Sequence, residues 1–126
     1  MDAQAVILHV EDDRSLQNLV RIALEQLGGY SVLTAESGEQ ALALAAGAKP
    51  ALLLLDLDLP GMSGVETLHA LRARPGLERV PAVFLTAAIG LQLEAELRAA
   101  GVAEVLRKPF RPRELVLAVR RVLGGA

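Results

Sequence analysis

Short, mostly aliphatic runs recur along the chain, separated by segments with helical spacing. Five such runs are present: Val6–Val10, Tyr30–Thr34, Ala51–Leu55, Val80–Leu85 and Val102–Leu106. Runs that stay apolar without alternation are typical of strands in parallel sheets, because helices cover both faces of such sheets. This pattern constrains the fold more than any other feature of the sequence, and it predicts five buried parallel strands.

The segments between the runs have apolar residues at helical spacing and recognisable ends. The five predicted helices are Ser15–Leu27, Ser37–Gly47, a segment around Val65–Leu71, Leu91–Ala100 and Pro112–Leu123. Ser37 is the expected N-cap of the second helix. Five strand–helix pairs in sequence predict an α/β protein with a doubly wound, five-stranded parallel sheet and five helices.

The length of 126 residues suits a single domain, with an ordered core expected at residues 4–123. A hydrophobic content of 52% excludes a disordered chain, and the absence of cysteine excludes disulfides, thiolate metal sites and cysteine nucleophiles. No apolar stretch approaches the roughly 18 residues that a membrane-spanning helix needs. The N-terminus lacks the features of a signal peptide. We therefore expect a cytoplasmic protein without membrane insertion.

The net charge of −2 conceals an asymmetry between the two halves of the chain. Residues 1–66 carry ten acids and three bases, whereas residues 67–126 carry five acids and ten bases. This balance does not favour direct nucleic-acid binding, although a basic C-terminal face could meet a partner. Four arginines, at positions 111, 113, 120 and 121, are interpreted as a solvated helix face, with a partner surface as the alternative.

Acidic residues follow the first and third predicted strands, at Glu11, Asp12 and Asp13 and at Asp56 and Asp58. In open parallel sheets, sites form at the carboxyl ends of the strands. Two unit charges about 4 Å apart repel by roughly 4 kcal/mol at an effective dielectric constant of 20. Such a cluster must bind a cation or hold a proton, and oxygen ligands in a partly solvated cleft suit Mg²⁺. The alternative is a solvated acidic rim.

Two further polar residues follow the fourth and fifth predicted strands. Thr86 supplies a hydroxyl, and Lys108 is one of two lysines in a chain that otherwise uses eleven arginines. A compact ammonium reaches into a small anion site where a planar guanidinium is bulky. Acids with a metal ion, a hydroxyl and an ammonium around one carboxylate predict a site for a phosphoryl group on Asp56.

With these residues in place, the sequence resembles the receiver domain of two-component response regulators over nearly its whole length. The matching motifs are Ile7–Asp13, Leu53–Gly64, Phe84–Ala87 and Lys108–Phe110, in this order. The resemblance implies a flavodoxin-like sheet with strand order 2-1-3-4-5. It also implies a phosphorylation-operated signalling switch that is not an enzyme in the ordinary sense, because it catalyses only its own phosphorylation and dephosphorylation.

By resemblance, Asp56 is the phosphoacceptor. Glu11, Asp12, Asp56 and the backbone carbonyl of Asp58 are the implied ligands of Mg²⁺, with Mn²⁺ as the alternative ion. We retain these assignments as expectations for the structure.

The resemblance also implies that Thr86 and Lys108 contact the phosphoryl oxygens. A cis peptide bond between Lys108 and Pro109 is expected for the same reason. The chain departs from the family pattern at Val105, where many receivers have a tyrosine or phenylalanine that turns inward when the threonine moves. The implied chemistry does not need this ring, but the usual aromatic switch is absent.

The implied phosphodonor is a sensor histidine kinase or a phosphotransfer protein, and small donors such as acetyl phosphate can substitute for it. The chain ends at Gly124-Gly125-Ala126 without an output domain. We therefore expect the signal to pass through an unknown downstream protein or through a domain outside this chain.

Two other functions remain as alternatives. A receiver fold can act as an interaction module without phosphorylation, which Val105 leaves open. The Asp56-Leu57-Asp58 sequence also resembles the nucleophile motif of haloacid-dehalogenase-type phosphatases, but that family carries its motif on the opening strand. We interpret His9 as a buried structural residue and His69 as a structural or surface residue.

Overall fold

The computed structural model of the chain describes residues 4–87 and 90–124. Five parallel strands form one sheet in the order β2-β1-β3-β4-β5, which confirms the predicted fold class. The strands are β1 (Val6–Val10), β2 (Ser31–Ala35), β3 (Leu52–Asp56), β4 (Ala82–Thr86) and β5 (Glu104–Arg107). The order reverses between β1 and β3, so the carboxyl ends of these two strands lie side by side.

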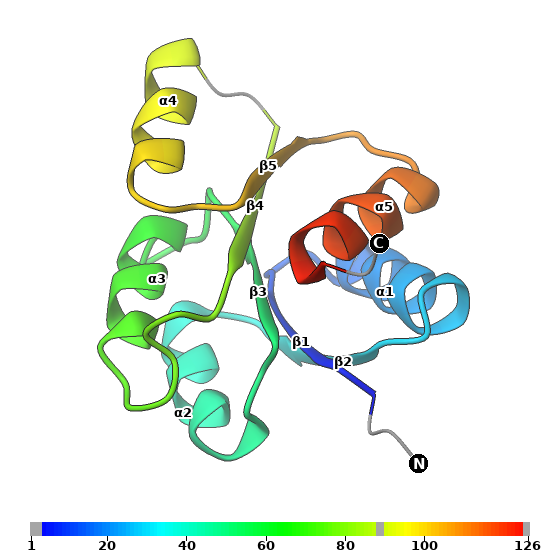
Figure 1. Ribbon diagram of the computed structural model, residues 1–126, viewed down its shortest axis with the longest axis horizontal. Helices are drawn as coiled ribbons and strands as arrows, with labels where there is room; N and C mark the ends of the chain where they lie inside the picture. The colour runs from blue at the N-terminus through cyan, green and yellow to red at the C-terminus, as the bar shows by residue number, and fades with distance from the viewer. Residues whose placement is uncertain (1–3, 88–89, 125–126) are drawn as a thin grey trace.

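Helices cover both faces of the sheet. They are α1 (Arg14–Ile22), continued by the π-helical segment η1 (Ala23–Leu27), then α2 (Gly38–Ala48), α3 (Gly64–Arg72), α4 (Leu91–Ala99) and α5 (Pro112–Leu123). α1 and α5 pack on one face, and α2, α3 and α4 lie on the other (Figure 1). None of the helices in the described residues is long and apolar enough to cross a membrane.

The hydrophobic core consists of two apolar layers, one on each side of the sheet. Successive side chains of a strand point to opposite faces, so each strand contributes to both layers. The layer under α2, α3 and α4 includes Leu8, Val10, Leu53, Leu55 and Phe84. The layer under α1 and α5 includes Ile7, Leu52, Leu54, Val83 and Leu85. All residues of β3 and β4 are buried, and all of them except the last ones, Asp56 and Thr86, are apolar.

Several strands begin and end later than the aliphatic runs indicated. β3 is Leu52–Asp56 where Ala51–Leu55 was expected, and β4 is Ala82–Thr86 where Val80–Leu85 was expected. The reason is that backbone pairing continues past the apolar residues, so that Asp56 lies opposite Leu85 and Thr86 lies opposite Arg107. β2 and β5 are displaced in the same direction. The polar residues at the carboxyl edge are therefore held by the sheet itself.

The ends of the first two helices also differ from expectation. The first helix has α-helical geometry only to Ile22 and is π-helical from Ala23 to Leu27. The second helix does not stop at Gly47 but continues to Ala48, and Lys49 adopts a left-handed conformation with φ 48°. Pro50 explains this end, because a proline disfavours helical backbone in the residue before it.

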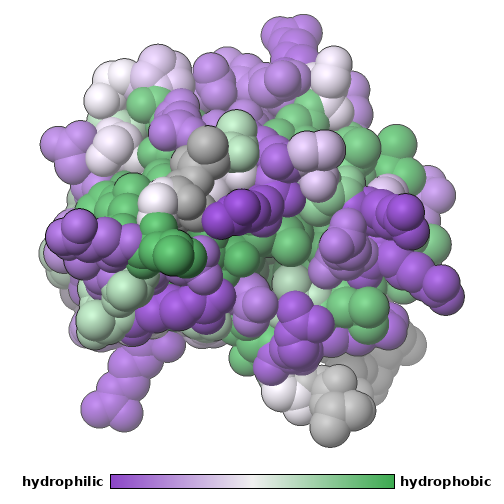
Figure 2. All heavy atoms as spheres, turned by 90° about the horizontal axis from the view of Figure 1, so that it is seen from above, coloured by the Kyte–Doolittle hydropathy of each residue, from purple (hydrophilic) through white to green (hydrophobic). Residues whose placement is uncertain are grey.

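Strand β5 forms one edge of the sheet and is only four residues long. Charged residues stand at both of its ends, and Glu104 pairs with Arg121 of α5 at 3.3 Å. Seen from the side of α4 and β5, hydrophobic side chains form small groups interrupted by hydrophilic ones (Figure 2). A short, charged edge strand of this kind resists pairing with other chains.

His9 is fully buried within β1, as the sequence predicted. Neither ring nitrogen has a hydrogen-bond partner among the residues that the structure describes. Burial, with smaller contributions from the charges of Lys108 and Arg21, lowers the pKa of His9 to about 3. The imidazole is thus neutral in the folded protein, whereas in the unfolded chain it accepts a proton near its ordinary pKa of 6.5.

This difference predicts acid destabilisation that originates at His9. Because the folded-state pKa is lowered, the contribution of His9 to stability is complete above pH 6.5. It is lost at about 1.4 kcal/mol per pH unit as the pH falls toward 3. His9→Leu should remove this part of the slope of unfolding free energy between pH 6.5 and 4.5, as measured by urea titration. The exposed His69 provides the control, since His69→Gln should keep the wild-type slope. Equal slopes in all three proteins would contradict the assignment.

Candidate functional site

Three carboxylates converge at the carboxyl edge of the sheet. Oxygen atoms of Glu11, Asp12 and Asp56 all lie within 4.8 Å of one another. Glu11 and Asp12 directly follow β1, and Asp56 is the last residue of the neighbouring β3. Glu11 is 1% exposed and Asp56 is 4% exposed, whereas Asp12 is open to solvent. The predicted convergence of acids from the first and third strands is therefore present.

Backbone contacts fix Glu11 on both sides. Its N–H donates to the carbonyl of Ala35 at the end of β2 (2.9 Å), and its own carbonyl accepts from Gln17 Nε2 (2.6 Å). The third acid of this segment, Asp13, has another role. Its Oδ1 accepts from the N–H groups of Ser15 and Leu16 and caps α1. Its own N–H donates to Glu11 Oε2 at 3.2 Å, so the helix cap also orients the buried glutamate.

Asp56 is held by the turn that follows it. The N–H of Asp58 donates to Asp56 Oδ1 at 3.1 Å, and the N–H of Leu57 donates to the carbonyl of Leu85 at 2.9 Å. The structure therefore brings Asp58 to the site through its backbone, while the residue itself is exposed. This hydrogen bond orients the carboxylate of Asp56.

Lys108 supplies the counter-charge. Its Nζ lies 3.4 Å from Asp56 Oδ1 and 3.5 Å from Glu11 Oε1. Its backbone N–H donates to the carbonyl of Thr86 at 2.8 Å, which places the buried Thr86 beside it at the end of β4. The peptide bond between Lys108 and Pro109 is cis, as the resemblance implied.

The charges at this edge do not balance. In the described part of the chain, the ion pairs of Glu11 and Asp56 are both made with Lys108. Three ionised carboxylates against one ammonium leave two negative charges, which is the charge that a divalent cation neutralises. The alternative is a bound proton, and burial followed by repulsion from Asp56 does raise the pKa of Glu11 to about 7. All-oxygen donors next to solvent suit Mg²⁺.

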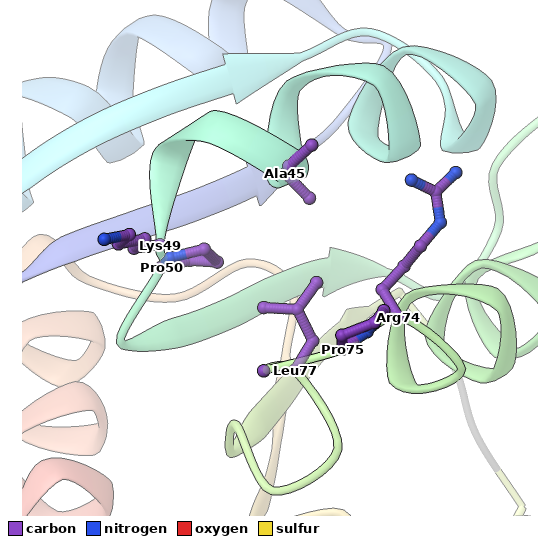
Figure 3. Close-up of a pocket in the computed structure, with 8 residues that line it drawn as sticks. Ala45, Lys49, Pro50, Arg74, Pro75 and Leu77 are labelled. Carbon is purple, nitrogen blue, oxygen red and sulfur yellow. The ribbon is translucent and has the colours of Figure 1, made fainter.

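A hollow of about 460 Å³ adjoins Lys108. It is lined by Asp13, Ser15, Leu16, Leu19, Ala87, Lys108, Pro109 and Phe110. A second hollow, of about 410 Å³, lies between the end of α2 and the loop after α3. There Ala45 and Leu77 lie on opposite sides, Arg74 extends along one wall, and Lys49 points away (Figure 3). This second hollow is at the other end of the strands and holds no carboxylate among its described lining residues.

Val105 lies within β5, opposite Phe84 of β4 in the register. It is half-buried and packs against the apolar layer under α2, α3 and α4. A small aliphatic side chain thus occupies the position where the family resemblance would place an aromatic ring.

The family model for the "Response regulator receiver domain" matches residues 7–120 of the chain. The chain belongs to this family. Receiver domains are the phosphorylation-operated switches of two-component signalling, and the predicted family and function are confirmed at this level. Membership also removes the phosphatase alternative.

Curated relatives include the phosphate regulon transcriptional regulatory protein PhoB of Pseudomonas aeruginosa, 37% identical over 93% of this chain and 51% of its own length. The transcriptional regulatory protein CpxR of Klebsiella pneumoniae is 42% identical over 93% of this chain and 48% of its own length. This receiver chain therefore spans about half the length of the curated relatives it matches.

Solved structures show the same fold. Chemotaxis protein CheY4 of Vibrio cholerae superposes with a TM-score of 0.89 at 34% identity, covering 95% of this chain and 99% of that one. The receiver domain of a sensor histidine kinase from Pseudomonas aeruginosa superposes with a TM-score of 0.84 at 34% identity, covering 97% and 99%. That structure is described as having a magnesium ion coordinated in its active site cleft.

The raised pKa of Glu11 predicts that this residue destabilises the metal-free receiver at neutral pH. Because the folded-state pKa of about 7 exceeds the ordinary 4.5, the contribution of Glu11 to stability is most favourable below pH 4.5 and is lost as the pH rises through 7. Glu11→Gln should therefore raise the unfolding free energy at pH 8 by about 1–3 kcal/mol, with little change at pH 4.5. Urea unfolding in EDTA measures the unfolding free energy at both pH values. Glu36→Gln, which changes an exposed glutamate, is the control, and a gain of equal size there would refute the assignment.

Proposed function

We propose that Asp56 is the phosphoacceptor of this receiver domain. The observation that carries the proposal is the position of its carboxylate, which is buried at the end of the central strand β3, 3.4 Å from the Lys108 ammonium and within the carboxylate cluster. The Asp58 N–H holds Oδ1. The carboxylate is thereby presented as a nucleophile with positive charge beside it.

We propose that Glu11, Asp12, Asp56 and the backbone carbonyl of Asp58 hold Mg²⁺, with Mn²⁺ as the alternative ion. The uncompensated negative charge of the cluster and its oxygen-only donors support this choice. When bound, the ion supplies positive charge that neutralises the oxygens of the phosphoryl group. The chain's own residues then have to orient the reacting groups and balance the remaining charge.

In the proposed reaction, an oxygen of Asp56 bonds to phosphorus while the bond from phosphorus to the donor's histidine nitrogen breaks. Lys108 and Thr86 contact the phosphoryl oxygens as they approach. Such transfers depend mainly on positioning and charge neutralisation, so few residues suffice. Hydrolysis of the acyl phosphate resets the switch, and the receiver catalyses no other reaction.

The proposed donor is a sensor histidine kinase or a phosphotransfer protein. The hollow beside Lys108 supports a protein donor, because apolar Leu16, Leu19 and Phe110 line it next to the site. Residues 1–126 form one receiver domain in this proposal, with its core at residues 4–123, and it works in the cytoplasm. The signal then passes to a downstream protein or to an output domain, not through direct nucleic-acid binding by the receiver.

Phosphorylation of Asp56 can be tested directly. Incubation with acetyl phosphate and Mg²⁺ should add one phosphoryl group to the wild-type protein, as measured by intact mass spectrometry. Asp56→Asn should abolish the gain, because an amide is not a nucleophile toward phosphorus. A gain that survives Asp56→Asn would refute the assignment. No gain in the wild type would favour an interaction module that acts without phosphorylation.

The metal ligands can be tested with two adjacent aspartates. Asp12→Asn should weaken Mg²⁺ binding by about tenfold or more, because one of the cluster's carboxylates is lost. Asp13→Asn removes the same charge one residue later but keeps an oxygen for capping α1, so the affinity should change less than about threefold. Isothermal titration calorimetry measures both. Equal losses would mean that overall charge, and not ligation, determines the affinity.

A further inference from the structure

The first residue of α3, Gly64, lies directly against the backbone of the strand that carries Asp56. A Cβ atom at this position would collide with the carbonyl oxygen of Asp56. It would also lie 3.0 Å from Leu57 Cα and 2.9 Å from Phe84 Cε1. Two of these three neighbours are backbone atoms of the strand end, which cannot move aside as a flexible side chain can. Only glycine, which has no Cβ atom, can therefore make this close contact.

The same contact closes the loop that leads from β3 to α3. The N–H of Gly64 donates to the carbonyl of Leu57 at 3.3 Å, so residues 58–63 leave the sheet and return to it. Within this loop, the Asp58 N–H donates to Asp56 Oδ1. At the other end, Ser63 and Glu66 form a reciprocal capping box that fixes the start of α3. The beginning of the helix and the carboxylate of Asp56 are thus linked through a few short contacts.

We infer that Gly64 is a positioning residue for the reaction at Asp56. By allowing α3 to touch the Asp56 carbonyl, it sets the position of the Asp56 carboxylate and of the Asp58 backbone. A methyl group at residue 64 would move the Asp56 carboxylate and the Asp58 backbone away from the other proposed ligands. The substitution would remove none of the charged side chains of the site. The inference rests on the proposed roles of Asp56 and Asp58.

Gly38 offers a matched control. It is the first residue of α2, and a Cβ there would be as crowded, colliding with Thr67 Oγ1 and lying 2.8 Å from Met62 Sδ. Both are side-chain atoms, of Met62 in the same loop and of the buried Thr67 in α3. Gly47, where a Cβ would meet nothing within 4 Å, provides the baseline. Gly64→Ala, Gly38→Ala and Gly47→Ala thus make the same chemical change in three different surroundings.

The experiment measures three properties of each variant. The ¹⁵N–¹H shift of the Asp58 amide in the metal-free protein reports its hydrogen bond to Asp56. Calorimetry gives the Mg²⁺ affinity, and intact mass gives the phosphorylation rate by acetyl phosphate as a function of Mg²⁺. Gly64→Ala should shift the Asp58 amide, weaken Mg²⁺ binding and slow phosphorylation at saturating Mg²⁺ by about 10- to 100-fold, because small misplacements of reacting groups are costly. Gly38→Ala should lower the melting temperature with less than about a threefold change in either rate or affinity.

A further variant covers the case in which Gly64→Ala does not fold. Adding Phe84→Leu removes the ring atom from the path of the new methyl group but leaves the contact with the Asp56 carbonyl. The double variant should regain stability and keep the phosphorylation defect, whereas Phe84→Leu alone should react at nearly the wild-type rate. Recovery of the rate in the double variant would show that the ring contact matters, which would overturn the inference.

The outcomes separate this inference from the function on which it rests. If wild-type protein gains no phosphoryl group, the proposed function fails, and the Asp58 shift and the Mg²⁺ affinity still decide whether Gly64 positions the cluster. If the wild type is phosphorylated and Gly64→Ala matches Gly38→Ala in all three properties, the inference fails while the function stands.

Discussion

The repulsion between the buried carboxylates of Glu11 and Asp56 is the constraint on which the rest of this receiver depends. At the separation of their oxygens, two such charges repel by about 3–4 kcal/mol at an effective dielectric constant of 20. Only Lys108 pairs with them in the described residues, and it is shared between the two. Burial and, after it, this repulsion raise the pKa of Glu11. The folded chain thus maintains an edge that gains stability whenever a proton or a cation arrives.

Maintaining that edge requires a rigid support, and the sheet provides it. Backbone pairing continues through Asp56 and Thr86, so these polar residues are held by the same hydrogen bonds as the apolar ones before them. Lys108 directly follows β5, and its backbone N–H donates to the carbonyl of Thr86. The two apolar layers on either side of the sheet keep these strands in place. Packing energy from the core therefore offsets the electrostatic cost of the site.

The fold and most of the site could be predicted from sequence because both depend on strong local signals. Strands buried on both faces must be continuously apolar, and the residues that break this pattern at the carboxyl end are then conspicuous. Lys108 stood out because the chain otherwise uses arginine almost exclusively. Val105 was recognisable as a departure only by comparison with a family pattern.

The features that could not be predicted depend on contacts between segments distant in sequence or on competition between local signals. Asp12 and Asp13 carry the same side chain, and only the folded structure shows that Asp13 caps α1 whereas Asp12 joins the cluster. Gly47 and Pro50 both signal a helix end, and the proline's steric effect decided it. In the sequence, Gly64 lies in a segment that indicates only a turn. That it abuts the Asp56 carbonyl becomes evident only when α3 is packed on the sheet.

Phe84 connects the site to the far edge of the sheet. Its ring lies against Gly64 at the start of α3, and its backbone pairs with β5 opposite Val105. In receivers with an aromatic residue at the latter position, rotation of a ring can alter the surface of β5. Valine is small and has few accessible χ1 rotamers, so its rotation changes that surface little. In this chain, Phe84 therefore links the start of α3, through its ring, with strand β5, through its backbone.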